Sequence, residues 1–107
     1  MRKKSNDRFD IAYGNLTELF RRIYAVDYDY PAQICAVWFV DELNEILGNE
    51  VLKSRLTLEH IDQISEMGTK LIRTTLLEGW VKGILNERLK ELVVLKSNLT
   101  SGAGLSK

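Results

Sequence analysis

This sequence has very few of the residues that mark secreted, sheet-rich or metal-binding proteins. Among its 107 residues it contains one cysteine, one proline and one histidine. A single cysteine cannot form an internal disulfide, and one histidine far from the cysteine gives no cluster of metal ligands. The Asn-Gly and Asp-Gly pairs that favour β-hairpins are also missing. These absences argue against a disulfide scaffold, a zinc site and a hairpin-rich sheet.

Long apolar runs and an excess of one charge are absent as well. No stretch approaches the eighteen apolar residues of a membrane span, and no signal-peptide pattern follows the basic N-terminus. Fifteen basic residues balance fifteen acidic ones, so total charge neither favours nor excludes nucleic acid as a partner. We therefore expect a cytoplasmic protein without a membrane span. The length predicts a single helical domain over residues 1–107.

What the sequence does contain is apolar residues that recur every third or fourth position. In residues 6–25 this spacing forms one stripe, and charged residues lie mostly off it. The pattern predicts an amphipathic helix of about five turns. The residues of the stripe are Phe9, Ala12, Tyr13, Leu16, Leu19, Phe20, Ile23 and Tyr24.

The next segment contains the densest apolar run of the chain, seven residues from Ile34 to Val40. Such a run is compatible with a buried strand or a buried helix. Pro31 fits a helix start and Gly48 fits a helix end, so the length favours a helix over residues 31–47. Because the run is apolar on every side, the sequence predicts a central helix of the bundle. We expect a second chain to cover at least one of Trp38, Phe39 and Val40.

The second half of the chain is divided by residues that favour helix ends. Asn49 and Thr57 are suitable N-caps, which predicts a helical segment over residues 50–67 with a break near 57. Gly68 then predicts a stop, or only a kink, before a last helix over residues 69–98. The whole chain is thus predicted to be all-α, a bundle of about four main helices. The apolar line of the last helix consists of Leu77, Val81, Ile84, Leu92, Leu95 and Leu99, with Arg88 among them.

The length of the last helix bears on assembly. Nearly thirty residues span about 45 Å, against about 25 Å for the helix over residues 31–47. The overhanging apolar line needs cover, and a second copy of the chain would supply it, so we expect a homodimer or higher oligomer. The alternative is a helix that bends at Gly79 or Gly83. Residues 1–5 are predicted to be a basic N-terminal arm and residues 99–107 a flexible tail.

Residues for catalysis are sparse. His60 lies in no recognisable nucleophile motif, and Cys35 lies within the apolar run, where a thiol is usually inert. The acidic groups fit a solvated helix face better than general acid–base work. We therefore predict no enzyme activity, no cofactor and no metal.

Protein–protein interaction is the function that the sequence favours, because it has no plausible catalytic set, its last helix has an overhanging apolar line, and residues 26–31 form an aromatic and acidic connector. We predict a small accessory protein, a regulator, adaptor or inhibitor, that associates with itself and with another protein. The predicted interface residues are Tyr28, Tyr30, Trp38, Phe39, Trp80, Leu92 and Leu95.

The alternative is a small DNA- or RNA-associated regulator that uses the basic arm. Clustered basic residues near the N-terminus could neutralise a few phosphates. Short basic termini are also common solubility features, and nearby acidic residues weaken the field of the first helix. The predicted nucleic-acid contacts are Arg2, Lys3, Lys4, Arg8, Arg21 and Arg22.

Overall fold

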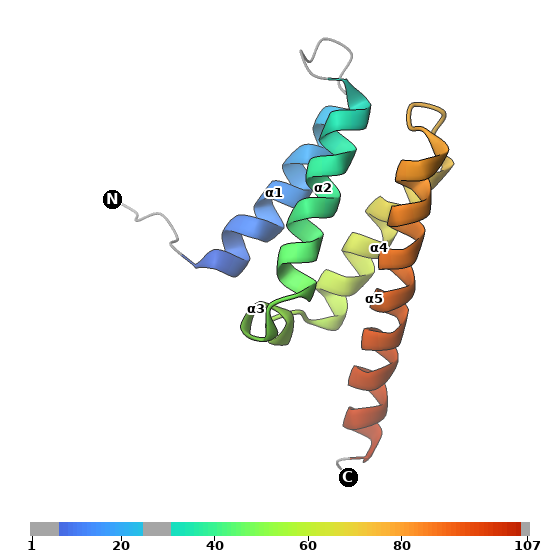
Figure 1. The fold of residues 1–107 in the computed structure, drawn as a ribbon. Helices are drawn as coiled ribbons and strands as arrows, with labels where there is room; N and C mark the ends of the chain where they lie inside the picture. Colours follow the sequence, from blue (N-terminus) through green and yellow to red (C-terminus); the bar gives the residue numbers. More distant parts are fainter. Residues whose placement is uncertain (1–6, 25–30, 106–107) are drawn as a thin grey trace. The chain divides into compact units, whose positions relative to one another are not determined.

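The computed structural model describes residues 7–24 and 31–105, which form helices and short connections without a strand (Figure 1). The all-α prediction is confirmed for this part of the chain. The chain divides into two compact units, Met1–Arg55 and Leu56–Lys107. The helices are α1 (Arg8–Ile23), α2 (Ala32–Leu47) and α3 (Glu50–Ser54) in the first unit, and α4 (Leu58–Arg73) and α5 (Gly79–Leu105) in the second. Whether the units form a single domain stays a prediction.

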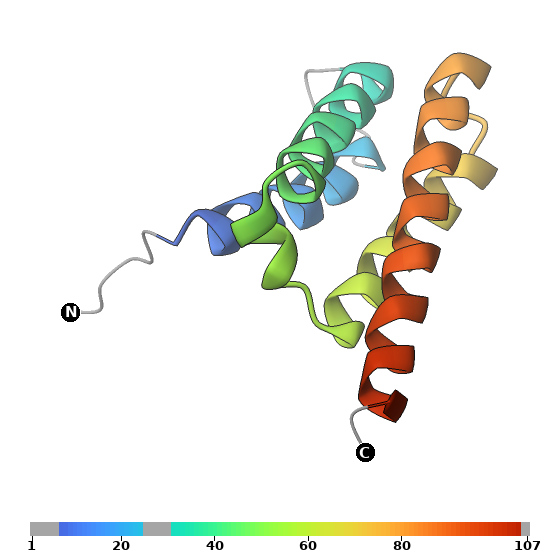
Figure 2. The same cartoon turned by 60° about the horizontal axis from the view of Figure 1, so that its bottom comes forward.

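In the first unit, α1 and α2 lie side by side and antiparallel, and the short α3 follows α2 (Figures 1 and 2). The Asp7 carboxylate caps α1 by accepting the Phe9 N–H at 2.8 Å. Burying each large apolar side chain contributes about 1.5–3 kcal/mol. The buried residues of α1, α2 and α3 are Phe9, Ala12, Leu16, Ile23, Cys35, Ala36, Phe39, Val40, Leu43, Ile46 and Leu52.

Helix α2 begins one residue later than predicted, because Pro31 occupies the N-cap position with extended backbone. Gly48 ends the helix as predicted. Phe39 and Val40 are buried, but Trp38 is 40 % exposed and Ile34 is 38 % exposed. The described residues thus cover one side of α2 only. The reason is helical geometry, since positions 34 and 38 lie one turn apart on the side away from the core.

Caps define the following helices. Asn49 accepts the backbone N–H groups of Val51 and Leu52 and starts α3. Thr57 starts α4 in a capping box, in which its hydroxyl accepts the His60 N–H and the His60 ring accepts the Thr57 N–H. The predicted break near residue 57 is therefore present, between α3 and α4.

The predicted stop at Gly68 is wrong, because α4 continues through this glycine to Arg73. Gly68 is buried, and a β-carbon built on it would lie 2.7 Å from Cδ2 of Leu89 on α5. The glycine therefore provides the space for the neighbouring helix. An ion pair between Glu66 and Lys70, 3.9 Å apart, spans the position. Helical packing outweighs the roughly 1 kcal/mol by which glycine weakens a helix.

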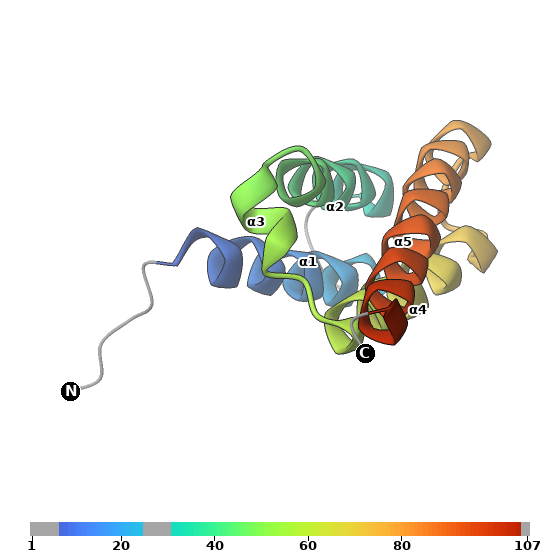
Figure 3. The same ribbon diagram turned by 90° about the horizontal axis from the view of Figure 1, so that it is seen from below.

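The break falls instead at residues 74–78, and α5 starts at Gly79 rather than at residue 69. Helices α4 and α5 run antiparallel, side by side, in every view (Figures 1 and 3). Neither Gly79 nor Gly83 breaks α5, and no heavy atom lies within 4 Å of a β-carbon built on either. Helix α5 continues to Leu105, past the predicted end at Asn98. The flexibility of residues 99–107 stays a prediction.

Candidate functional site

A hollow between α1 and α2 contains the most exposed aromatic side chain of α2. We call it the Trp38 hollow. Its volume is about 230 Å³, and Trp38 forms part of its wall while remaining 40 % exposed. A bulky indole at the rim of a concave surface is typical of binding sites. The residues that line the hollow are Asn15, Glu18, Leu19 and Arg22 of α1 and Trp38 and Glu42 of α2.

Polar contacts join the two helices at the Trp38 hollow and also connect side chains along α1. Nδ2 of Asn15 donates to Oε2 of Glu42 at 3.2 Å, which joins α1 to α2. Along α1, Glu18 accepts from the guanidinium groups of Arg21 at 2.5 Å and Arg22 at 2.8 Å. The Arg21 hydrogen bond is the main cause that lowers the pKa of Glu18. Arg22, the cation that lines the hollow, thus already pairs with Glu18 of the same helix.

Of the three carboxylates of α2, only one has a basic partner among the described residues. Helix α2 contains Asp41, Glu42 and Glu45 but no lysine or arginine. Glu45 pairs with Arg8 of α1. Neither Asp41 nor Glu42 forms an ion pair with a described residue. Because they stand three and four residues after Trp38, both carboxylates lie one turn from the indole on the same side of α2.

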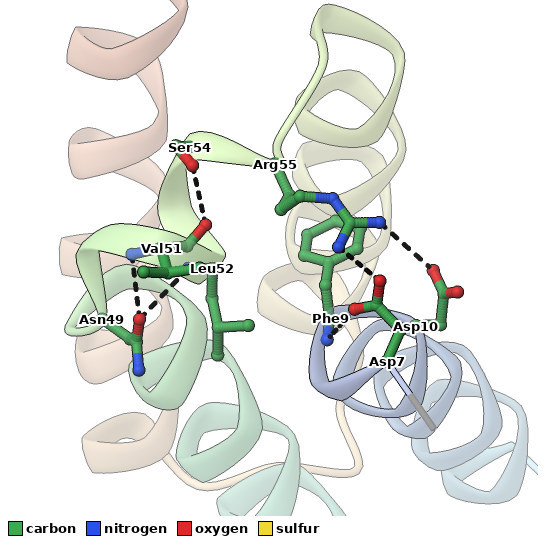
Figure 4. Close-up of polar contacts among 8 residues, drawn as sticks. All are labelled: Asp7, Phe9, Asp10, Asn49, Val51, Leu52, Ser54 and Arg55. Carbon is green, nitrogen blue, oxygen red and sulfur yellow. Dashed lines mark hydrogen bonds and ion pairs between the residues drawn. The ribbon is translucent and has the colours of Figure 1, made fainter. Parts of the chain in front are cut away.

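A second polar cluster joins the start of α1 to the end of α3 (Figure 4). The guanidinium of Arg55 contacts Asp7 at 2.5 Å and Asp10 at 3.9 Å, and it lies over the ring of Phe9 at 5.1 Å from the centroid. The hydrogen bond from Arg55 is the main cause that lowers the pKa of Asp7. No local pattern predicts this cluster, because Asp7 and Arg55 are 48 positions apart in the sequence.

A third group of exposed side chains lies at and beyond the start of α5. Trp80 is 56 % exposed, and its indole N–H donates to Glu78 at 3.0 Å. Further exposed apolar residues stand before α5 and along its later turns. They are Leu76, Val93, Val94 and Leu99.

The predicted interface residues fall into three classes. Trp38 and Trp80 are exposed, and Leu95 is half-buried. Phe39 and Leu92 are fully buried, at 0 % exposure, because they stand on the core-facing sides of α2 and α5. A side chain that the chain itself covers presents no surface to a partner. Tyr28 and Tyr30 lie outside the described residues.

The predicted nucleic-acid contacts on α1 each have a carboxylate beside them. Arg8 pairs with Glu45, and both Arg21 and Arg22 pair with Glu18. An arginine paired in this way adds less to a field that attracts phosphates. The three remaining predicted contacts, Arg2, Lys3 and Lys4, lie outside the described residues.

The two residues considered for catalysis have structural roles. His60 uses its ring to complete the cap of α4. Cys35 is fully buried, and burial raises the pKa of its thiol, which keeps it protonated. Arg88 of α5, which lies among the residues of the predicted apolar line, pairs with Glu91. Within residues 7–24 and 31–105, no three His, Cys, Asp or Glu side chains are placed to hold a metal ion.

The sequence favours a solvated helix face for the acidic groups, Asp41 and Glu42 among them. Their spacing from Trp38 was the signal that could have connected them with the indole.

Within the described part of the chain, every helix is too short or too polar to cross a membrane. Comparison with models of known protein families, with curated proteins and with solved structures finds no match for this chain.

Proposed function

We propose that this protein is a non-enzymatic helical accessory protein, a regulator, adaptor or inhibitor, that acts by binding another protein. One observation carries the proposal: both tryptophans are substantially exposed, Trp38 at 40 % and Trp80 at 56 %. Tryptophan is enriched among the residues that dominate binding energy at interfaces, because it offers a large contact area. Solvent exposure of such side chains is unfavourable unless a partner covers them.

The small size of the two units supports self-association as a further part of the proposal. The units Met1–Arg55 and Leu56–Lys107 are each near 50 residues, a size at which a folded chain buries a modest share of its surface. Assembly of the longer helices into one bundle, and pairing with a second copy, would both add buried area. Exposed Val94 and half-buried Leu95 on α5 are available for such a contact.

Affinity capture from the native host tests the binding function. We expect the wild-type protein to recover a partner that either Trp38→Ala or Trp80→Ala loses. Glu87→Gln is the matched control, since Glu87 is exposed on α5 and pairs only weakly with Lys90 at 3.8 Å. Circular dichroism confirms that each variant is folded. Recovery of the same proteins by all three variants would contradict the proposal.

Sedimentation tests self-association separately. We expect Leu95→Glu to give a smaller species than the wild type, because a charge at a contact between copies costs the desolvation of that charge. Leu92→Glu is unsuitable, since Leu92 is fully buried and its substitution would unfold the helix pair. A wild-type monomer at high micromolar concentration would exclude the oligomer.

A further inference from the structure

We propose that the Trp38 hollow receives an arginine-rich amphipathic helix of a partner protein. The proposal rests on the proposed function and specifies the chemistry of its partner. Apolar side chains of the partner would cover Ile34 and Trp38, and a guanidinium would stack on the indole and bind the carboxylates beside it. Four observations support this occupant.

The first observation is the shape and composition of the surface. The hollow has room for one large side chain, at about 230 Å³, and Trp38 and Leu19 contribute apolar walls to it. Ile34, 38 % exposed, extends the apolar surface by one helical turn beyond Trp38. An apolar line of this length along a helix pair fits the apolar side of another helix.

The second observation is charge. Glu42 lines the hollow, and its Oε2 accepts from the neutral amide of Asn15, so the carboxylate has no cation among the described residues. Asp41 is exposed and has no ion pair within the same residues. A cationic partner would supply the counter-charge that both carboxylates lack.

The third observation is that the nearby arginines of α1 do not neutralise Asp41 or Glu42. Arg21 and Arg22 both donate to Glu18, and Arg8 pairs with Glu45. Each of these arginines is therefore matched to another carboxylate, which leaves Asp41 and Glu42 as the unmatched charges of this face.

The fourth observation selects arginine over lysine. A guanidinium is planar, so it can stack on an indole while its edge donates two hydrogen bonds to a carboxylate. Asp41 and Glu42 follow Trp38 by three and four residues, which places carboxylates near the edge of a group stacked on the ring. An ammonium can make either contact, but it lacks the flat face and the paired donors.

A designed peptide provides the direct test. The probe is an 18-residue helix with leucines along one side and arginines on both flanks, and the matched peptides replace every arginine by lysine or by glutamate. The two indole N–H signals of the protein, from Trp38 and Trp80, are followed by NMR during titration. We expect the arginine peptide to shift the Trp38 signal and leave the Trp80 signal in place. The lysine peptide should bind several-fold more weakly, and the glutamate peptide should not bind.

Variants of the protein complete the test. Glu42→Gln and Asp41→Asn, which preserve the shape of both side chains, should each weaken the arginine peptide about tenfold, and Trp38→Ala should abolish its binding. Glu87→Gln on α5 is the control and should leave binding unchanged. Because Asp41 is exposed, its variant tests the inference even if Trp38→Ala perturbs the fold.

Four outcomes would overturn the inference. The Trp38 signal could remain unshifted, or shift equally with the glutamate peptide. It could instead change with protein concentration alone, which would make a second copy of the chain the occupant. A host partner that is lost with Trp80→Ala and retained with Trp38→Ala would also refute it, while the proposed binding function would stand.

Discussion

The two helix pairs of this protein both have polar contacts between their helices, but they differ in packing at one point. Between α1 and α2, polar contacts such as Asn15 to Glu42 and Arg8 to Glu45 join the helices beside a hollow. Between α4 and α5, Lys96 pairs with Asp62 at 2.6 Å, and in addition Gly68 lets Leu89 approach the backbone closely. The first pair has a concave surface, the Trp38 hollow, that can accept a partner. In the second pair, several exposed apolar side chains lie along α5.

The largest expected change in stability comes from core substitutions, one in each helix pair. Leu16 and Leu92 are both fully buried, so Leu16→Ala and Leu92→Ala should each lower the free energy of unfolding by about 3 kcal/mol. Trp38 reports on the first pair and Trp80 on the second when the other tryptophan is replaced by phenylalanine. Urea unfolding followed by fluorescence measures both.

The same experiment tests the predicted single domain. In one cooperative domain, Leu92→Ala shifts the Trp38 and Trp80 transitions together. If Leu92→Ala moves the Trp80 transition alone, the two pairs unfold independently and the single-domain prediction is wrong.

A pair of glycine variants sharpens the contrast in packing. At Gly68 an added methyl group meets Leu89, so Gly68→Ala should destabilise the protein by about 1 kcal/mol, even after the gain in helix propensity. At Gly83 the added methyl group meets nothing, so Gly83→Ala should stabilise by about 0.5–1 kcal/mol. Thermal unfolding gives both values. Equal effects at the two positions would show that α5 does not approach α4 at Gly68.

Substitutions in the N-cap of α4 should change the stability by a similar or smaller amount. Thr57→Ala removes the acceptor for the His60 N–H and should cost about 1 kcal/mol. His60→Ala should cost less, and His60→Gln should retain most of the stability, because glutamine also completes a capping box. Chemical unfolding monitored through Trp80 measures these differences. A loss in His60→Gln as large as that in Thr57→Ala would exclude the capping role.

The smallest expected effect concerns pH and belongs to the first pair. The bond from Arg55 depresses the pKa of Asp7 below its ordinary value of 3.8. Its stabilising contribution is therefore complete above that value and is lost as pH falls through the lower, folded-state pKa. Asp7→Asn keeps a residue that can cap α1 but removes the charge.

We therefore expect the Asp7→Asn variant to lose less stability than the wild type between pH 6 and pH 3. Unfolding followed through Trp38 at both pH values measures the difference. Equal losses in the two proteins would mean that the Arg55 contact contributes nothing to this pH dependence.

Local signals allowed the helices to be predicted, and contacts between helices accounted for most of the errors. The caps at Asn49 and Thr57 act on residues two or three positions away, so the sequence contains the whole interaction. Gly68 has the local character of a helix end, and only the presence of Leu89 makes it a packing residue. A bend at Gly79 or Gly83 was an open alternative in the sequence, and α5 begins at the first and continues through the second.

The candidate site likewise could be predicted only where the signal is local, and not where it depends on contacts between helices. The sequence singled out Trp38 as an interface residue, and the indole is indeed exposed. Its neighbour Asn15 comes from another helix, and no local pattern connects the two. The buried positions of Phe39 and Leu92 likewise depend on which side of each helix meets its partner, which a run of consecutive apolar residues does not reveal.

The contact between Arg55 and Asp7 has a consequence for how the first helix pair is connected. It brings the start of α1 and the end of α3 within an ion-pair distance of each other. Neighbouring ends are the geometry that allows a chain to be circularly permuted, with a short linker across the old termini and a new opening elsewhere. The order in which α1 and α2 occur in the gene is therefore not required by the contacts that hold them together.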